Sequence, residues 1–300
     1  MSKRYLANNE SLIKKALYLR LMAEDIAEGM KSGNFSSLYR GQGIEFAGVR
    51  DYNRGDDIRT IDWNVTARMG RPYIKIFEEE RELQIFLIVD SSSSMQLENS
   101  SDRRTKYSAA AETAALVAIA AELNACPAGA VFFDGAIHFS CEPSLGKENT
   151  MQLLNHLDRL PDSPTVGSVL PNAITAAAKV LRKRSLVFIL SDFRSGGWEK
   201  PLISLAQKND VIAINLHDAS DEELPSLGTV NFMDAESGLK MALPSSSPAF
   251  KKEWRNYNEM NQNRWQDFCI KHGAMPVILD TKTEPVQVLN QIFSRKARLR

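Results

Sequence analysis

The chain has 300 residues and a mass of 33.5 kDa; 43% of its residues are hydrophobic and 25% are charged. This composition is typical of a globular protein with a sizeable core, and it excludes disordered and collagen-like chains. The 37 basic side chains are balanced by 37 acidic ones, so the sequence lacks the positive surplus expected of a protein that binds nucleic acid or anionic membranes.

The cysteine pattern and the lengths of the apolar runs bear on the cellular location of the protein. Cys126, Cys141 and Cys269 are odd in number and far apart, which favours neither a disulfide framework nor a zinc ribbon. The first ten residues lack the apolar core of a signal peptide, and the run from Ala109 to Ala121 is too short and too polar to span a bilayer. We therefore expect a cytoplasmic protein without membrane insertion.

The N-terminal part combines one helix with a charged, loop-rich stretch. Apolar residues recur at helical spacing from Glu10 to Lys31, and Gly33 suits the end of that helix. From Gly41 to Arg71 the chain is rich in Gly, Asp and Arg with interleaved aromatic residues, which predicts ordered loops and short strands.

Apolar runs and amphipathic stretches then alternate along the chain. Strands are predicted at Ile85–Val89, Gly129–Phe133, Ala136–Ser140, Leu186–Leu190, Val211–Leu216 and Pro276–Leu279. Helices are predicted at Lys106–Leu123, Thr150–Leu160, Val169–Leu181, Glu199–Lys208, Ala249–His272 and Val286–Phe293. Asp134-Gly135 predicts a hairpin between the second and third strands. This alternation predicts an α/β fold, a three-layer sandwich of Rossmann type around a mostly parallel central sheet.

We expect residues 81–300 to form this α/β domain. Residues 1–80 would form an N-terminal helix and a charged extension packed on it.

Two predicted strands end in loops that carry acids and hydroxyls. Asp90, Ser92 and Ser94 occupy alternate positions after the first strand, so in an extended segment they would point the same way. Ser168 opens a predicted helix, and Asp192 follows the strand Leu186–Leu190. Because the carboxyl ends of parallel strands gather ligands, these oxygens predict a site for Mg²⁺ or another divalent cation. A simpler interpretation is that the serines cap helices and Asp192 ends a strand.

Acidic and basic residues alternate closely between Glu45 and Asp62. Such balanced charges usually form ion pairs that order a loop. A functional alternative makes this segment a surface for docking a partner, beside the metal. The residues expected to carry it are Phe46, Tyr52, Asp57, Arg59 and Trp63.

Two groups of residues resemble known families. Asp90-x-Ser92-x-Ser94 resembles the metal-ion-dependent adhesion site of von Willebrand factor A domains, and Asp192 matches within Ser191-Asp192-Phe193. A longer set resembles the bacterial family called domain of unknown function 58. It comprises Gly43-Ile44-Glu45-Phe46, Arg50-Asp51-Tyr52, Gly55-Asp56-Asp57-Ile58-Arg59, Ile61-Asp62-Trp63-Asn64, Ala67-Arg68, Lys75, Glu78-Glu79-Glu80-Arg81-Glu82, Leu224-Pro225 and Asp234-Ala235-Glu236.

The resemblance implies a von Willebrand factor A-like domain that works with a MoxR-type AAA+ ATPase in a chaperone-like or regulatory role. The second adhesion-site loop usually carries Thr; we place Ser168 there, and a shift of the alignment would put Thr165 in its position.

The expected function is a non-enzymatic, cation-dependent interaction module with no catalytic residues, bound by the ATPase and an unknown client protein. The sequence has no Walker A, G-x-G-x-x-G or G-x-S-x-G motif. The alternative is a metal-dependent phosphoester hydrolase or phosphotransferase that uses the same acidic loops. A metal-free scaffold is a third possibility.

Overall fold

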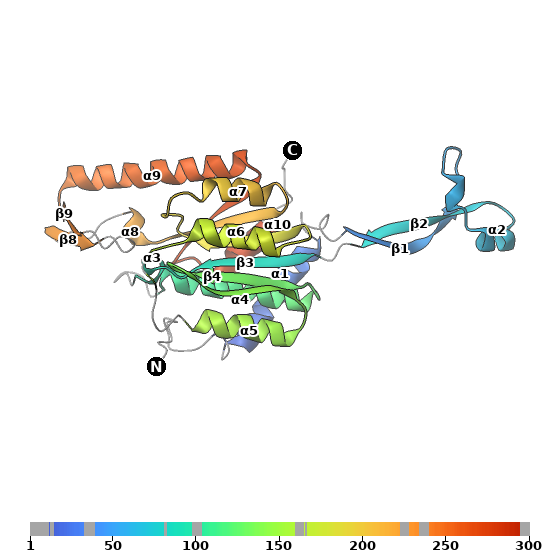
Figure 1. Cartoon of the computed structure of the whole chain (residues 1–300), viewed down its shortest axis with the longest axis horizontal. Helices are drawn as coiled ribbons and strands as arrows, with labels where there is room; N and C mark the ends of the chain where they lie inside the picture. Colours follow the sequence, from blue (N-terminus) through green and yellow to red (C-terminus); the bar gives the residue numbers. More distant parts are fainter. Residues whose placement is uncertain are drawn as a thin grey trace.

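The computed structural model describes residues 12, 15–32, 40–80, 83–97, 104–159, 165, 167–222, 228–233 and 240–294. The predicted segments Leu224-Pro225 and Asp234-Ala235-Glu236 lie outside these residues. The described residues form a mixed α/β core and an arm, residues 40–80, that extends to one side of it (Figure 1).

A six-stranded sheet forms the centre of the core. Its strands, in spatial order, are β10 (Ala274–Asp280), β7 (Asp210–His217), β6 (Ser185–Ser191), β3 (Gln84–Asp90), β4 (Ala128–Phe133) and β5 (Ile137–Ser144). All neighbours are parallel except β4 and β5, which form the hairpin predicted at Asp134-Gly135. Strands β4 and β6 are buried at every position because helices cover both faces of the sheet.

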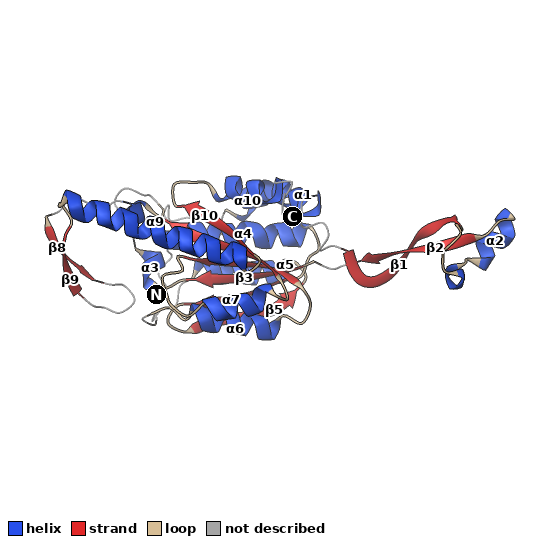
Figure 2. Cartoon of the chain, turned by 90° about the horizontal axis from the view of Figure 1, so that it is seen from above, coloured by secondary structure: helices blue, strands red, loops and turns tan. Residues whose placement is uncertain are grey.

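Helices lie on the two faces of the sheet and form two separate hydrophobic clusters. One face carries α1 (Ala16–Ser32), α4 (Lys106–Leu123), α5 (Lys147–Asp158) and α10 (Pro285–Ser294). The other carries α6 (Leu170–Val180), α7 (Glu199–Ala206) and α9 (Pro248–Lys271). Figure 2 shows α1 beside α10, on the side of the sheet away from α6 and α7.

Helix α4 is buried along 15 of its 18 residues. Eight of those 18 residues are alanine, so the helix lies close against the sheet while α1, α5 and α10 cover its outer side. Its first residue is Lys106, which is 2% exposed. The helix therefore brings one buried cation to the carboxyl edge of the sheet, where β3 and β6 end.

The arm contains strands, as predicted, but they are longer than the short strands expected among loops. A long strand, β1 (Arg40–Asp51), pairs antiparallel with β2 (Tyr73–Glu80), and the turn between them contains a short 3₁₀ helix (Ile58–Thr60) and α2 (Trp63–Met69). The Gly- and charge-rich sequence did not predict the length of β1. No layer of helices covers this strand, so its residues need not form a continuous apolar run. Of residues 1–80, α1 packs on the core, whereas the arm lies to the side of it (Figure 1).

Four further elements were not predicted. These are α3 (Ser93–Gln96), α8 (Ala219–Glu222), and the strands β8 (Thr229–Met233) and β9 (Lys240–Pro244), which pair antiparallel with each other. β8 and β9 lie near the start of α9, at the end of the molecule opposite the arm (Figures 1 and 2).

Candidate metal site

Three segments of the chain meet at the carboxylate of Asp90, the last residue of β3. The side chain is 1% exposed. Its Oδ1 accepts a hydrogen bond from the Ser92 backbone N–H (2.9 Å), and its Oδ2 accepts from the hydroxyls of Ser191 (2.7 Å) and Ser168 (3.3 Å). Loops that are 78 and 101 residues away in sequence therefore converge above the end of β3.

Ser92 and Ser94 also face one another, with their hydroxyl oxygens 3.2 Å apart. The expected extended geometry is wrong here: the chain turns into α3 directly after β3, and a helical turn brings the two hydroxyls together. Ser92 occupies the N-cap position of α3, but its side chain makes no capping hydrogen bond. The simpler interpretation, that this serine only caps a helix, therefore does not account for its hydroxyl.

Asp192 supplies a second carboxylate from the loop after β6. The side chain is 8% exposed, and its Oδ1 accepts from the Arg194 backbone N–H at 3.2 Å. Its Oδ2 is buried and has no hydrogen-bond partner among the described residues. The nearest charges to this oxygen are Arg194 Nε at 3.6 Å and Lys106 Nζ at 3.9 Å. One oxygen of Asp192 is thus available to a further ligand.

The two carboxylates influence each other. Burial, and then the negative charge of Asp192, raise the pKa of Asp90 to about 7. A cation held between them would remove this repulsion. The donor set of two carboxylates and several hydroxyls consists of oxygen alone, which fits a hard cation such as Mg²⁺. The described residues contain no cluster of three or more Asp, Glu, His or Cys side chains, so any ion here would depend on serine hydroxyls for part of its coordination.

The second-loop position is taken by Ser168 and not by Thr165. The Ser168 hydroxyl reaches Asp90, whereas the Thr165 backbone N–H donates to Asp134 Oδ2 at 3.1 Å and its carbonyl accepts from Gly135. Thr165 is therefore fastened to the hairpin loop after β4, and its side chain is exposed.

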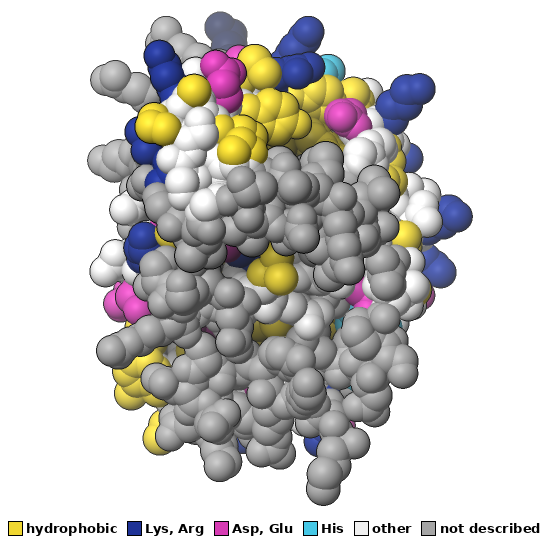
Figure 3. All heavy atoms as spheres, turned by 90° about the vertical axis from the view of Figure 1, so that its left-hand side faces the viewer, with side chains coloured by type: hydrophobic (Ala, Val, Ile, Leu, Met, Phe, Trp, Pro, Cys, Tyr) yellow, Lys and Arg dark blue, Asp and Glu magenta, His cyan; other side chains and the backbone are white. Residues whose placement is uncertain are grey.

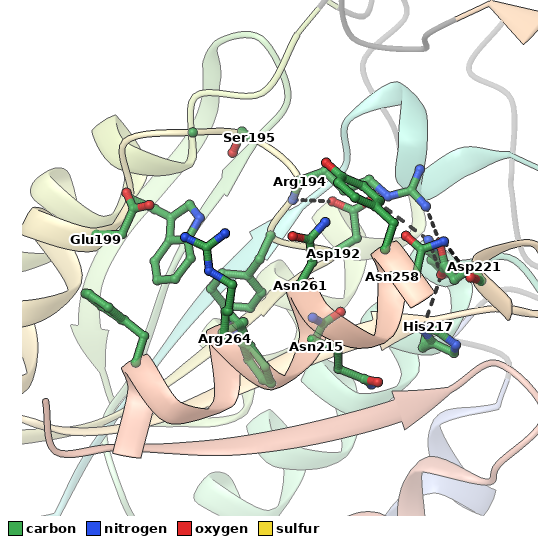
Figure 4. Close-up of a pocket in the computed structure, with 18 of the residues that line it drawn as sticks. Asp192, Arg194, Ser195, Glu199, Asn215, His217, Asp221, Asn258, Asn261 and Arg264 are labelled. Atoms are coloured by element: carbon green, nitrogen blue, oxygen red, sulfur yellow. Dashed lines mark hydrogen bonds and ion pairs between the residues drawn. The ribbon is translucent and has the colours of Figure 1, made fainter. Parts of the chain in front are cut away.

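Sequence reasoning missed several residues of this region. Ser191 was noted only as a neighbour of Asp192, yet its hydroxyl makes the shortest bond to Asp90. Lys106 Nζ lies 2.8 Å from Asp221 Oδ2, and Arg194 also pairs with Asp221 (Figure 4). The sequence held one signal for Lys106. A lysine in the first turn of a helix opposes the helix dipole, so a buried lysine at that position requires acidic side chains nearby.

The predicted docking residues lie on the arm. Trp63 is 69% exposed, Arg59 is exposed, and Tyr52 is half-buried. Asp57 caps the 3₁₀ helix by accepting from the Arg59 N–H at 3.0 Å. The side chain of Phe46 lies outside the described residues.

The charged residues of the arm form ion pairs, and the arm is not beside the metal site. Arg50 holds Asp56 in a two-point contact of 2.7 and 2.8 Å. The expected position next to the metal is wrong: the arm leaves the core at the start of β3, while Asp90 lies at its end, so α2 and α3 are at opposite ends of the molecule (Figure 1).

Comparison with curated sequences identifies relatives in mycobacteria. An uncharacterized protein of Mycobacterium tuberculosis is 31% identical over 238 residues, which are 79% of this chain and 74% of that protein. An uncharacterized protein of Mycobacterium bovis is similar to the same extent.

Two solved structures are similar to this chain at low identity and low TM-score. The conserved hypothetical protein BatB from Bacteroides thetaiotaomicron is 14% identical with a TM-score of 0.44, covering 72% of this chain and 99% of that one. An aerotolerance-related membrane protein from Bacteroides fragilis is 13% identical with a TM-score of 0.44, covering 71% and 99%.

The expected cytoplasmic location is contradicted by the descriptions of solved neighbours, one an aerotolerance-related membrane protein and another a membrane-spanning protein from Vibrio fischeri. Composition could not decide the location, since a domain surrounded by water has the same composition whether or not its protein is attached to a membrane. Within the described ranges, the structure contains no helix that is both long and apolar enough to cross a bilayer.

A family model described as "Protein of unknown function DUF58" matches residues 48–264, which include most of the arm, Asp90, Ser168 and Asp192. With this match over most of the chain and the mycobacterial relatives over 79% of it, the chain belongs to the DUF58 family.

Proposed function

We propose that this chain is a non-enzymatic protein-interaction module with a von Willebrand factor A-like core, and that a divalent cation, Mg²⁺ foremost, is required for its binding. Asp90, Ser92, Ser94, Ser168 and Asp192 would hold the ion. The observation that carries the proposal is the convergence of these side chains at the carboxyl edge of the sheet, with a buried carboxylate oxygen of Asp192 left without a partner.

The residues of the site suggest how it would bind. The serine hydroxyls are neutral ligands, and the site has only two carboxylates. A bound ion would therefore keep much of its positive charge. The bound ion would supply an attraction for a carboxylate on another protein. Lys106 and Arg194 hold Asp192 and Asp221 in place, and the fixed carboxylates make the site rigid before any ion arrives.

The proposed partners are a MoxR-type AAA+ ATPase and a client protein. The ATPase follows from the family resemblance, because members of the family are typically found beside such ATPases. The arm is proposed as a second contact surface through Tyr52, Asp57, Arg59 and Trp63. Exposed Ile58 and Met69, at 67% and 56%, lie close to them in the sequence.

A binding assay with purified proteins tests this function. The MoxR-type ATPase encoded in the same genome is captured on the immobilised full chain, with Mg²⁺ or with excess chelator. We expect capture with Mg²⁺ only, and no capture by Asp90→Ala. Asp267→Ala changes an exposed acid on α9 and should behave as wild type.

Equal capture in chelator would contradict the proposal. Turnover of a generic phosphoester that Asp192→Asn abolishes would instead identify an enzyme.

A further inference from the structure

A cavity of about 640 Å³ opens beside the candidate metal site, between α9 and the loops after β6 and β7 (Figure 4). Its volume is within the range of about 300–1,000 Å³ that is usual for ligand sites. Asp192 lines the cavity and is also one of the proposed metal ligands, so the two sites are continuous. Of the proposed metal ligands, Asp192 alone lines the cavity.

Aromatic rings form one end of the cavity. Phe193 packs against Trp198 and Trp265 with ring centroids 5.4 and 5.2 Å apart, and Trp198 packs against Phe268 at 5.3 Å. Phe193, Trp198 and Trp265 are 8%, 8% and 5% exposed, so they offer the cavity a small apolar area held rigidly by the core. This end of the cavity is therefore suited to an apolar or aromatic side chain.

Amides and one cation line the side formed by α9. Asn258, Asn261, Gln262 and Arg264 come from this helix, and Asn261 and Arg264 project toward the loop that carries Ser195 (Figure 4). Asn258 donates to the Asp221 carbonyl, whereas Asn261, Gln262 and Arg264 have no side-chain partner among the described residues. Amide side chains can both donate and accept, which matches the N–H and C=O groups of a peptide.

Every buried side-chain atom that lacks a hydrogen bond in the described part of the chain belongs to a residue of this cavity. The three atoms are Asp192 Oδ2, Ser195 Oγ and Trp265 Nε1. An unpaired buried polar group costs about 1–3 kcal/mol, and native proteins keep few of them. Their concentration at one cavity indicates that bound groups complete the hydrogen bonds there.

Among the charged side chains that line the cavity, Arg264 and Glu199 have no ion-pair partner in the described part of the chain. Lys106 and Arg194 are committed to Asp221 and Asp192, so they add little free positive charge. Arg264 is an exposed cation with no acid paired to it among the described residues. A second carboxylate on the ligand would therefore find its partner at Arg264.

The face around the cavity carries further apolar groups. Figure 3 shows the side of the molecule that includes the start of α9, and hydrophobic side chains gather in its upper part. Tyr257 and Met260 of α9 are 58% and 51% exposed. Tyr257 itself lines the cavity.

We infer that this cavity binds the peptide segment of the protein partner that flanks its metal-binding carboxylate. An apolar or aromatic residue of that segment lies among Trp198, Trp265 and Phe268, its backbone bonds to the amides of α9, and a second acid pairs with Arg264. This inference rests on the proposed function, and it names the chemistry of the partner: an acidic peptide with an apolar residue close to the acid.

A displayed peptide library with one fixed Asp and randomised flanks tests the inference. It is selected on the immobilised full chain in Mg²⁺, and the best peptide is labelled for fluorescence polarisation. We expect enrichment of an aromatic or large apolar residue and of a further acid near the fixed Asp. Arg264→Glu should weaken that peptide about tenfold, while Arg255→Glu, an exposed arginine of α9 outside the cavity, should leave its affinity unchanged.

Intrinsic fluorescence provides a second measurement that needs no cavity variant. Of the four tryptophans, Trp198, Trp254 and Trp265 line the cavity and Trp63 lies on the arm. In Trp63→Phe, every remaining indole lies at the cavity, so the peptide should shift the emission spectrum.

The outcomes separate the inference from the proposed function. Binding that requires Mg²⁺ and Asp90 but is unaffected by Arg264→Glu, with unchanged emission, would overturn the inference and leave the proposed function intact. Binding that is lost in Arg264→Glu but persists in chelator would support the cavity and contradict the metal. Failure to select any peptide would overturn both.

Discussion

Asp90 has an acidic side chain in a place that disfavours its charge. It is 1% exposed, and burial together with the charge of Asp192 raises its pKa from 3.8 to about 7. Three hydrogen bonds to the carboxylate offset only part of this effect. Without an ion, the ionised form of Asp90 therefore destabilises the folded protein at the point where an ion is proposed to bind.

This penalty predicts how the stability of the metal-free protein depends on pH. The unfolded chain loses the Asp90 proton near pH 3.8 and the folded chain near 7, so the unfolding free energy contributed by this group falls as pH rises through that window. The loss is up to about 4 kcal/mol for a shift of about three pKa units. Asp90→Asn cannot ionise and should lack this component.

Denaturant unfolding in chelator, from pH 4 to pH 7.5, measures the difference. The gap between Asp90→Asn and wild type should widen with pH in favour of the variant. Parallel curves would show that Asp90 is not destabilised by its surroundings.

At the scale of elements, the edge hairpin of β4 and β5 depends on one residue without a side chain. A Cβ placed on Gly129 would lie 2.7 Å from the Pro143 backbone N and 2.9 Å from the Cys141 carbonyl oxygen. Backbone cannot move aside as a flexible side chain does, so the two strands would have to separate. The turn of this hairpin also contains Asp134, whose carboxylate accepts a hydrogen bond from the backbone N–H of Thr165, three residues before Ser168.

We expect Gly129→Ala to destabilise the protein by about 1–3 kcal/mol. The matched control is Gly196→Ala, because no atom lies within 4 Å of a Cβ there and its backbone is not left-handed; its effect should stay within about 0.5 kcal/mol. Thermal unfolding of both variants measures this, and equal melting temperatures would contradict the assigned contact.

The sequence predicted the elements of the core better than those outside it. Continuous apolar runs identified the buried strands, and the Ala-rich stretch gave α4 with its observed bounds, Lys106–Leu123. The arm was predicted only as short strands among loops and the β8–β9 pair was not predicted, because strands outside the layered core need no apolar pattern.

The site was predictable in the same uneven way. Asp90, Ser92 and Ser94 follow one strand, so their proximity follows from local sequence. Ser168 and Asp192 come close to Asp90 only because of the order of the strands in the sheet. Their proximity could be anticipated because ligands bind at the carboxyl ends of parallel strands. Ser191 and Asp221 were not predicted, because their contacts depend on side-chain packing between segments far apart in the chain, and Lys106 was signalled only by its place in the first turn of a helix.

At the scale of the whole molecule, the proposed contact surfaces lie at opposite ends. The metal site and the cavity are at the carboxyl edge of the sheet, while the arm extends from the other edge (Figure 1). A module with this shape can hold two proteins at once, which suits a role between an ATPase and a client.

Opposite placement predicts that the two surfaces can be disabled separately. Asp57→Arg combined with Arg59→Asp preserves the net charge of the arm but reverses its pattern. We expect this double variant to weaken capture of the ATPase at least severalfold, while the effect of Mg²⁺ on the melting temperature is unchanged. Both changed residues are exposed, so the stability of the core should be unaffected.

Surface plasmon resonance with the ATPase, and a thermal melt of the same sample, give the two measurements. Full binding by the stably folded double variant would exclude the arm as a contact surface.

Titration of Mg²⁺ into chelator-treated protein shows whether oxygen atoms from three loops hold a divalent cation. Ligands of the native state stabilise it, by about 2.7 kcal/mol at ~100 times the dissociation constant. We expect Mg²⁺ to raise the melting temperature of wild type by several degrees, to raise that of Asp267→Ala equally, and to have no effect on Asp90→Ala or Asp192→Ala. A wild-type melting temperature that does not respond to Mg²⁺, or an equal rise in the two site variants, would contradict this expectation.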